Sequence, residues 1–264
     1  MTGIPSVLYR NPGKKSMRAL ASSVKKVYDG EYHEANASGD GPRRTEREDG
    51  KLQLRHAIWD FDGMLFDSYP HMATAFQKVL AARGETATLA QILLPMKRSV
   101  GLAFQVFGLN EAEQRQYARF EEQLELDPPV RPFAGVPALL RAFCAAGGRH
   151  YIYSHRNATV FLYLDQYGIR DCFADCVTGD QGFPGKPAPD ALLYLLRKHG
   201  IQPDEALMLG DREIDVQCGH NAGMAACLFD EFARRPATEA EYCVTEIRGL
   251  YSVLGLTRPA ETEV

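Results

Sequence analysis

The sequence predicts an α/β fold in which a parallel sheet carries helices on both faces and an all-α segment is inserted near its start. Short apolar segments alternate with amphipathic helical segments from residue 54 to residue 256, and such alternation is typical of parallel sheets. Between residues 68 and 133 the alternation stops and only helical patterns remain. The first observation predicts the sheet, and the second predicts the insert.

Composition and charge narrow the class of protein. The chain has 264 residues, of which 45% are hydrophobic and 24% charged, as in ordinary globular domains. The net charge of −4 argues against nucleic acid as the main partner. No apolar run approaches the ~20 residues of a membrane-spanning helix, so no transmembrane segment is expected. The six cysteines lack zinc-site spacing, and we interpret them as reduced, which favours a cytoplasmic location.

The N-terminal region differs from the rest of the chain. Residues 1–28 contain six basic residues and no acidic one, and Met17, Leu20 and Val24 fall on one helical face. We expect residues 1–52 to form a basic helix followed by a flexible linker. A basic, acid-free amphipathic segment is also typical of organelle targeting, which stays open as the alternative to a cytoplasmic location.

A helical subdomain is expected directly after the first strand. Pro70 stands at a helix start, apolar residues follow at helical spacing, and Gly84 ends the pattern. Two or three more helices are expected over residues 86–126, the last of them capped by Asn110, before "DPPVRPF" breaks the pattern. We therefore assign the insert to residues 68–133.

The α/β core is expected to comprise residues 53–67 and 134–264. Its predicted strands are 54–59, 149–154, 173–178, 206–210, 225–229 and a short segment that begins "YCV". Its predicted helices are 135–146, 157–167, 189–199, 213–223 and a final helix near the end of the chain. This order places each helix as the crossover between parallel strands.

Six polar residues follow the carboxyl ends of these strands, the edge at which open parallel sheets bind ligands. They are Asp60 and Asp62 after the first strand, Ser154 after the next, Lys186 in the "GKPAPD" loop, and Asp211 and Asp215 in "GDREID". Four carboxylates, one hydroxyl and one ammonium are therefore expected at a single edge.

This set of groups predicts a Mg²⁺ site and phosphate chemistry. Clustered carboxylates need a cation, and an oxygen-rich set without sulfur suits Mg²⁺, which keeps waters and phosphate oxygens among its ligands. Lys186 can neutralise a bound phosphate, and Ser154 can add a hydrogen bond. One aspartate can act as a covalent nucleophile, while a second protonates the leaving group and then activates water.

The motifs themselves resemble a known family. "DFDG" at residues 60–63, Ser154, Lys186, and "GD" at 210–211 with Asp215 are similar, in order, to the four motifs of the haloacid dehalogenase superfamily. Over residues 54–255 the chain looks like the phosphatase branch, in particular the phosphoglycolate-phosphatase-like members with a helical cap after the first motif. The resemblance implies a Rossmann-like parallel sheet and makes the insert this cap.

The resemblance also implies a role for each residue. Asp60 would be the nucleophile that forms an aspartyl-phosphate, and Asp62 the general acid and base. The phosphoryl group would be held by Ser154 and Lys186. The implied Mg²⁺ ligands are Asp60, Asp62 through its backbone carbonyl, Asp211 and Asp215, the last directly or through a water. Because the two neighbouring carboxylates repel each other, we expect Asp62 to be biased towards its protonated form.

The chain departs from the family pattern in two places. Met64 stands where the family usually has threonine, and a thioether cannot replace a hydroxyl donor, so support for the nucleophile loop and the level of activity are open. "SHRN" places His155 and Arg156 after the motif-two serine. We expect both to face solvent or the helix start, with contact to a substrate anion as the alternative, which also applies to Arg212.

The leading functional hypothesis is a Mg²⁺-dependent phosphomonoester hydrolase of a small phosphorylated metabolite. A phosphomutase of the same fold is an alternative, as is a weakly active regulatory protein that uses residues 1–52. A phosphonate hydrolase would require a Schiff-base lysine in the cap, Lys78 or Lys97. The sequence predicts neither the identity of the substrate nor the oligomeric state.

Overall fold

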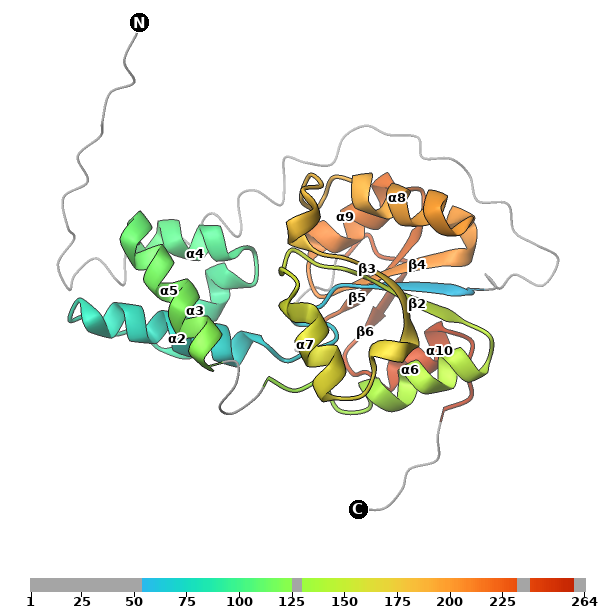
Figure 1. Cartoon of the computed structure of the whole chain (residues 1–264), viewed down its shortest axis with the longest axis horizontal. Coiled ribbons are helices and arrows are strands. Elements are labelled where there is room, and N and C mark those ends of the chain that lie inside the picture. Colours follow the sequence, from blue (N-terminus) through green and yellow to red (C-terminus); the bar gives the residue numbers. More distant parts are fainter. Residues whose placement is uncertain (1–53, 125–129, 232–237, 259–264) are drawn as a thin grey trace, which may run out of the picture.

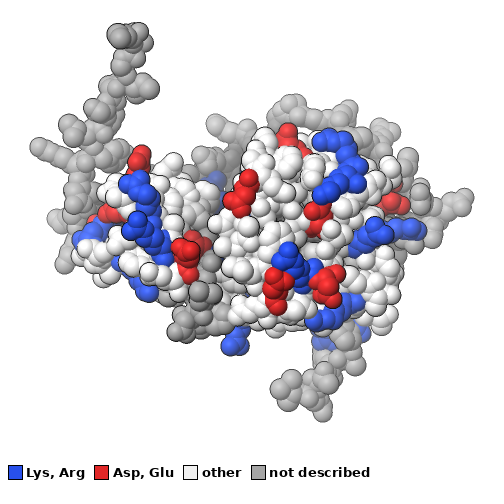
Figure 2. All heavy atoms as spheres, viewed as in Figure 1, with Lys and Arg blue, Asp and Glu red and all other residues white. Residues whose placement is uncertain are grey.

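The computed structural model describes residues 54–124, 130–231 and 238–258, and Figure 1 shows their arrangement. The N-terminal basic helix and linker expected over residues 1–52 lie outside this range. No helix within it has both the length and the apolar character needed to cross a bilayer. Acidic and basic side chains are interspersed on the face seen in Figure 2.

Six parallel strands form one sheet in the order β3-β2-β1-β4-β5-β6. The central strand, β1 (His56–Trp59), pairs with β2 (Arg149–Tyr153) on one side and β4 (Ala206–Gly210) on the other. The outer strands are β3 (Phe173–Val177), β5 (Ala225–Phe229) and β6 (Tyr242–Val244). The carboxyl ends of β2, β1 and β4 are therefore adjacent.

Helices cover both faces of the sheet, as the alternation predicts (Figure 1). One face packs against α6 (Val136–Ala145), α7 (Thr159–Gln166) and α10 (Gly249–Val253). The other face packs against α8 (Asp190–His199) and α9 (Glu213–Asn221). Along β1, the side chains of Ala57 and Trp59 enter the first apolar cluster, and Ile58 enters the second. This two-residue period leaves the side chains of Ala57, Ile58 and Trp59 inside a core, while His56 at the start of the strand is half-buried.

The insert is all-helical and has an apolar core of its own (Figure 1). It contains α2 (Tyr69–Ala82), α3 (Leu89–Met96), α4 (Val100–Phe107) and α5 (Glu111–Leu124). Asn110 caps α5 as predicted, because its Oδ1 accepts hydrogen bonds from the backbone N–H groups of Ala112 and Glu113 at 2.9 and 3.1 Å. The helical cap of the predicted fold is confirmed, while its limits at 68 and 133 stay a prediction.

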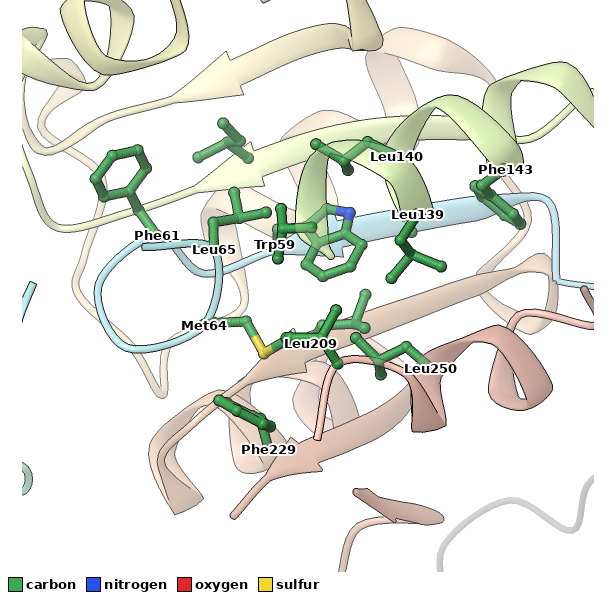
Figure 3. Packing of buried hydrophobic residues seen from close by; sticks show 14 of the residues in the cluster. Trp59, Phe61, Met64, Leu65, Leu139, Leu140, Phe143, Leu209, Phe229 and Leu250 are labelled. Carbon is green, nitrogen blue, oxygen red and sulfur yellow. The ribbon is translucent and has the colours of Figure 1, made fainter. Parts of the chain in front are cut away.

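Met64 takes part in packing. Its side chain is fully buried, and Figure 3 shows its sulfur beside Leu209 and Phe229 in the cluster beneath the loop that follows β1. A threonine there would fill less of this space and would place a hydroxyl among apolar groups.

We therefore expect Met64→Thr to lower the free energy of unfolding by about 2 to 3 kcal/mol, the cost of a smaller and more polar side chain in a core. Urea denaturation measures this change. Leu162→Thr is the control, since Leu162 is 65% exposed and replacing an apolar side chain by threonine there should alter stability by only ~0.5 kcal/mol. Unchanged stability of Met64→Thr would contradict this packing role.

Candidate active site

The predicted site residues meet at the carboxyl edge of the sheet. Asp60 directly follows β1, Ser154 follows β2, and Asp211 follows β4. Backbone hydrogen bonds continue the ladder past the strand ends, from Asp60 N–H to Leu209 O at 2.8 Å and from Ser154 N–H to Val177 O at 2.9 Å. Both side chains are therefore held by rigid backbone.

Gly63 allows the loop after β1 to approach β4 closely. Its φ of +81° lies in the left-handed region, and a Cβ there would stand 2.3 Å from Tyr69 Cε2 and 2.8 Å from Asp211 Cγ. Only glycine accepts both conditions without strain. The sequence "DFDG" thus brings the first-strand loop against the motif that supplies Asp211.

Three buried carboxylates form a compact cluster. Asp60, Asp211 and Asp215 each offer one oxygen, and these oxygens lie within 4.8 Å of one another. The fully buried Lys186 Nζ contacts Asp60 Oδ1 at 2.6 Å and Asp215 Oδ1 at 2.8 Å. The guanidinium of Arg212 adds a weaker contact, 3.4 Å from Nη2 to Asp60 Oδ2.

Lys186 and Arg212 do not fully compensate the negative charge of the three carboxylates, as the pKa values of these groups indicate. Burial raises the pKa of Asp211 to about 7, and the charges of Asp215 and Asp60 add to this rise, partly offset by Arg212. Burial also raises the pKa of Asp60 by more than Lys186 lowers it. For Asp215, the charges of Lys186 and Arg212 outweigh burial and lower the pKa. A divalent cation would stabilise the ionised form of all three carboxylates.

The cluster fits a hard cation in its chemistry. All three groups are carboxylates, they converge within reach of one ion, and they supply the oxygen ligands that Mg²⁺ prefers. The side chain of Asp62 is not in this cluster. A contribution from the Asp62 backbone carbonyl stays a prediction.

Asp62 is instead bound by Arg156. The Nε of Arg156 lies 3.1 and 3.2 Å from the two carboxylate oxygens, and Nη2 lies 2.8 Å from Oδ1. Burial alone would raise the pKa of Asp62, but the charge and hydrogen bonds of Arg156 lower it. The predicted bias of Asp62 towards the protonated form is therefore wrong, because the charge and hydrogen bonds of Arg156, 94 positions away in the chain, outweigh the effect of burial on this pKa.

The motif-two residues take different positions. Ser154 is buried, and its Oγ accepts a hydrogen bond from the Arg156 N–H at 3.0 Å. His155 Nε2 accepts one from the Lys186 N–H at 3.0 Å and so supports the loop that carries this lysine. For Arg156 the sequence predicts a side chain that faces solvent or the helix start. This side chain is only 9% exposed, so the prediction of solvent is wrong, and its guanidinium lies 5.7 Å from the ring of Tyr163 in α7.

A cavity of about 290 Å³ lies between the cap and this edge of the core. The core contributes Asp60, Asp62, Ser154, His155 and Arg212 to its lining. The cap contributes Tyr69, Met72, Met96, Ser99, Val100 and Gly101. The charged groups therefore come from the sheet edge, and the cap adds a mainly apolar wall with one hydroxyl each from a tyrosine and a serine.

Besides the pair of Arg156 and Asp62, two contacts were missed by reasoning from the sequence. Tyr69 Oη donates to Asp211 Oδ1 at 3.5 Å, and Arg156 Nη2 contacts Glu121 Oε1 of α5 at 3.3 Å. Tyr69 comes six residues after Gly63 of the "DFDG" loop, and this short separation in the sequence could have indicated a place near the site. Glu121 had none, because its contact joins the cap to a distant part of the core.

The comparisons with known proteins point in one direction. A family model described as haloacid dehalogenase-like hydrolase matches residues 57–229. A phosphoglycolate phosphatase of Rhodospirillum rubrum is 31% identical over 198 residues, 68% of this chain and 81% of that protein. One from Vibrio vulnificus is 29% identical over 188 residues, 66% of this chain and 82% of its own. The crystal structure of a hydrolase from Streptococcus pneumoniae, 32% identical, has a TM-score of 0.57 and covers 78% of this chain and 100% of its own.

Proposed function

The chain belongs to the haloacid dehalogenase-like hydrolase family and is a phosphatase, and we propose that it is a Mg²⁺-dependent phosphomonoester hydrolase that acts through an aspartyl-phosphate on Asp60. The observation that carries the proposal is the convergence of Asp60, Asp211 and Asp215 with Lys186 at one sheet edge. Since similar proteins are named phosphoglycolate phosphatases, a small phosphorylated metabolite is the proposed substrate, with phosphoglycolate as the first candidate.

Asp60, Asp211 and Asp215 would hold the metal ion. A bound Mg²⁺ would neutralise charge on the phosphoryl oxygens. Ser154 and Lys186 would bind the same group, the first through its hydroxyl and the second as a buried point charge. Arg212 lines the cavity and stands beside Asp60, which places a further cation where the phosphoryl group would bind.

The reaction proceeds in two displacements. In the first, an oxygen of Asp60 attacks phosphorus, the bond from phosphorus to the ester oxygen breaks, and Asp62 donates its proton to the leaving alcohol. In the second, Asp62 accepts a proton from a water molecule that attacks the aspartyl-phosphate. Inorganic phosphate leaves, and the Asp60 carboxylate is regenerated.

Asp62 needs a proton for the first displacement, although Arg156 favours its ionised form. A phosphoryl group bound in the shared cavity brings negative charge next to Asp62. Like charge raises the pKa of a carboxyl group, so substrate binding shifts Asp62 towards the acid that the reaction requires.

Metal removal tests the proposal. We expect phosphate release from phosphoglycolate, other alkyl phosphates and an aryl phosphate to fall by ~10²-fold or more when EDTA removes divalent cations, and to return with Mg²⁺, because three carboxylates then lack their shared cation. Asp211→Asn should weaken Mg²⁺ binding, followed by calorimetry, by ~10-fold or more. Asp190→Asn, at an exposed acid of α8, is the control.

The same set of phosphate esters also distinguishes the hydrolase from the alternative functions. Equal phosphate release with and without Mg²⁺ would contradict the metal role, and no release from any ester would contradict the hydrolase. A phosphomutase would transfer phosphate within a sugar phosphate and would need a bisphosphate activator. Lys78 lies over the ring of Phe120 and Lys97 over that of Tyr69, and neither is among the residues that line the cavity, so the cavity gives no support to a Schiff base. Met64 packs in the core and no longer supports a weakly active regulatory protein.

A further inference from the structure

We propose that Arg156 is a positioning residue for Asp62 and that Glu121 of the cap completes its support. The carboxyl group that serves as general acid and base is then fully oriented only when α5 is seated on the core. This inference rests on the proposed function, since it concerns the proton transfers of that reaction.

The contact with Arg156 orients the carboxylate of Asp62 as well as neutralising its charge. Three N···O distances of 2.8 to 3.2 Å join the guanidinium to both oxygens of the carboxylate. A planar fork that engages both oxygens fixes the plane of the carboxylate, which a lysine ammonium cannot do. The two side chains are 9% and 21% exposed, so little water competes for these bonds.

Glu121 brings a cap residue into this arrangement. Its Oε1 lies 3.3 Å from Arg156 Nη2, the nitrogen that also makes the shortest contact to Asp62, and its side chain is 19% exposed. One helical turn earlier on α5, the ring of Tyr117 packs against Phe76 and Phe104 in the cap core, with centroids 5.9 and 5.3 Å apart. The position of Glu121 therefore follows that of the whole cap.

The core holds the guanidinium from its other sides. The centre of the Arg156 guanidinium lies 5.7 Å from the ring centroids of both Phe61 and Tyr163, within the range of cation–π attraction. Arg156 is absent from the cavity lining, whereas Asp62 belongs to it. Arg156 thus stands behind Asp62 and acts on the substrate through it.

Leaving-group dependence reveals a positioning role. A proton from Asp62 matters most when the departing oxygen is strongly basic, as in an alkyl phosphate, and matters little for 4-nitrophenyl phosphate. Misplacement of Asp62 should therefore slow alkyl esters selectively. A loss of folded protein or of metal would slow both esters equally.

The experiment measures kcat/KM with Mg²⁺ for phosphoglycolate and 4-nitrophenyl phosphate. We expect Arg156→Lys, which keeps the charge, to lower kcat/KM for the alkyl ester by ~10- to 100-fold, part of the ~10² to 10⁴ that a general acid contributes, and for the aryl ester by less than ~3-fold. Glu121→Gln should give a smaller loss with the same selectivity, and no further loss when combined with Arg156→Lys. The matched control is Glu122→Gln, at the exposed neighbouring position of α5. Equal losses on both esters, or additive losses in the double variant, would overturn the proposal.

Hydrogen exchange gives a readout that does not depend on activity. Glu121→Gln should speed amide exchange in α5 relative to Glu122→Gln and leave the strands unchanged, because the contact to the core is weakened. Exchange in α5 identical to wild type would overturn the role of the cap. If the wild-type protein released no phosphate from either ester, the proposed function and the positioning role would fail together, and α5 exchange alone would decide whether Glu121 ties the cap to the core.

Discussion

Asp60→Asn is expected to abolish phosphate release, with a fall in kcat on the order of 10³-fold or more, as for other enzymes that lose their nucleophile. The amide is nearly the same size as the carboxyl group but cannot form the aspartyl-phosphate. Asp60 is buried directly after β1, at the edge where Lys186 and the other acids converge. Phosphate release from phosphoglycolate with saturating Mg²⁺ measures the effect.

Asp67→Asn is the matched control for this substitution. Asp67 lies in the same loop, but its side chain is exposed, so its replacement should leave the rate within ~3-fold of wild type. Circular dichroism should show both variants folded. Substantial turnover by Asp60→Asn would rule out Asp60 as the nucleophile, and an equal loss in both variants would point to damage to the loop.

Lys186→Met is expected to reduce both activity and stability. The Lys186 ammonium is fully buried between Asp60 and Asp215, and removing one partner of a buried ion pair costs about 3 to 5 kcal/mol because the remaining charge is left uncompensated. Activity should fall by ~10²-fold or more, since the cation is also expected to bind the phosphoryl group. Thermal denaturation and phosphate release measure the two effects.

Mg²⁺ provides an internal check on this second prediction. A divalent cation at the three carboxylates replaces part of the missing charge, so Mg²⁺ should raise the melting temperature of Lys186→Met by more than that of wild type. Lys198→Met is the control, because Lys198 pairs with Asp175 at the surface and its side chain is 46% exposed, so solvent screens this pair and its loss should change the melting temperature far less. A Lys186→Met variant as stable as wild type without Mg²⁺ would contradict this account of the cluster.

Much of the architecture followed from local patterns. Short continuous apolar runs such as 206–210 and 225–229, separated by amphipathic helical segments, are typical of buried parallel strands and could be assigned without any tertiary information, and the structure has β4 and β5 at these positions. Because the strands are parallel, their carboxyl ends share one edge. Asp60, Ser154 and Asp211 could therefore be placed together from their positions alone.

The direction of the Met64 side chain, unlike the positions of the strands, could not be predicted from local patterns. The motif pattern showed that Met64 departs from the family but not where the side chain points. The structure turns it into the apolar cluster beside Leu209 and Phe229 (Figure 3). The methionine at position 64, which as a replacement of threonine suggested weaker support for the loop after β1, contributes a packing contact to the core.

The charge state of Asp62 depends on residues that are near it in space but far from it in the chain. The sequence determined that two carboxylates stand two residues apart at a strand end, and nearest-neighbour repulsion then predicted a protonated Asp62. The structure brings Arg156 from the loop after β2 and Glu121 from the cap to the same place, and Arg156 reverses the sign of the predicted pKa shift. Coulomb energies depend on separation in space and on exposure to water, and folding sets both for residues far apart in the chain.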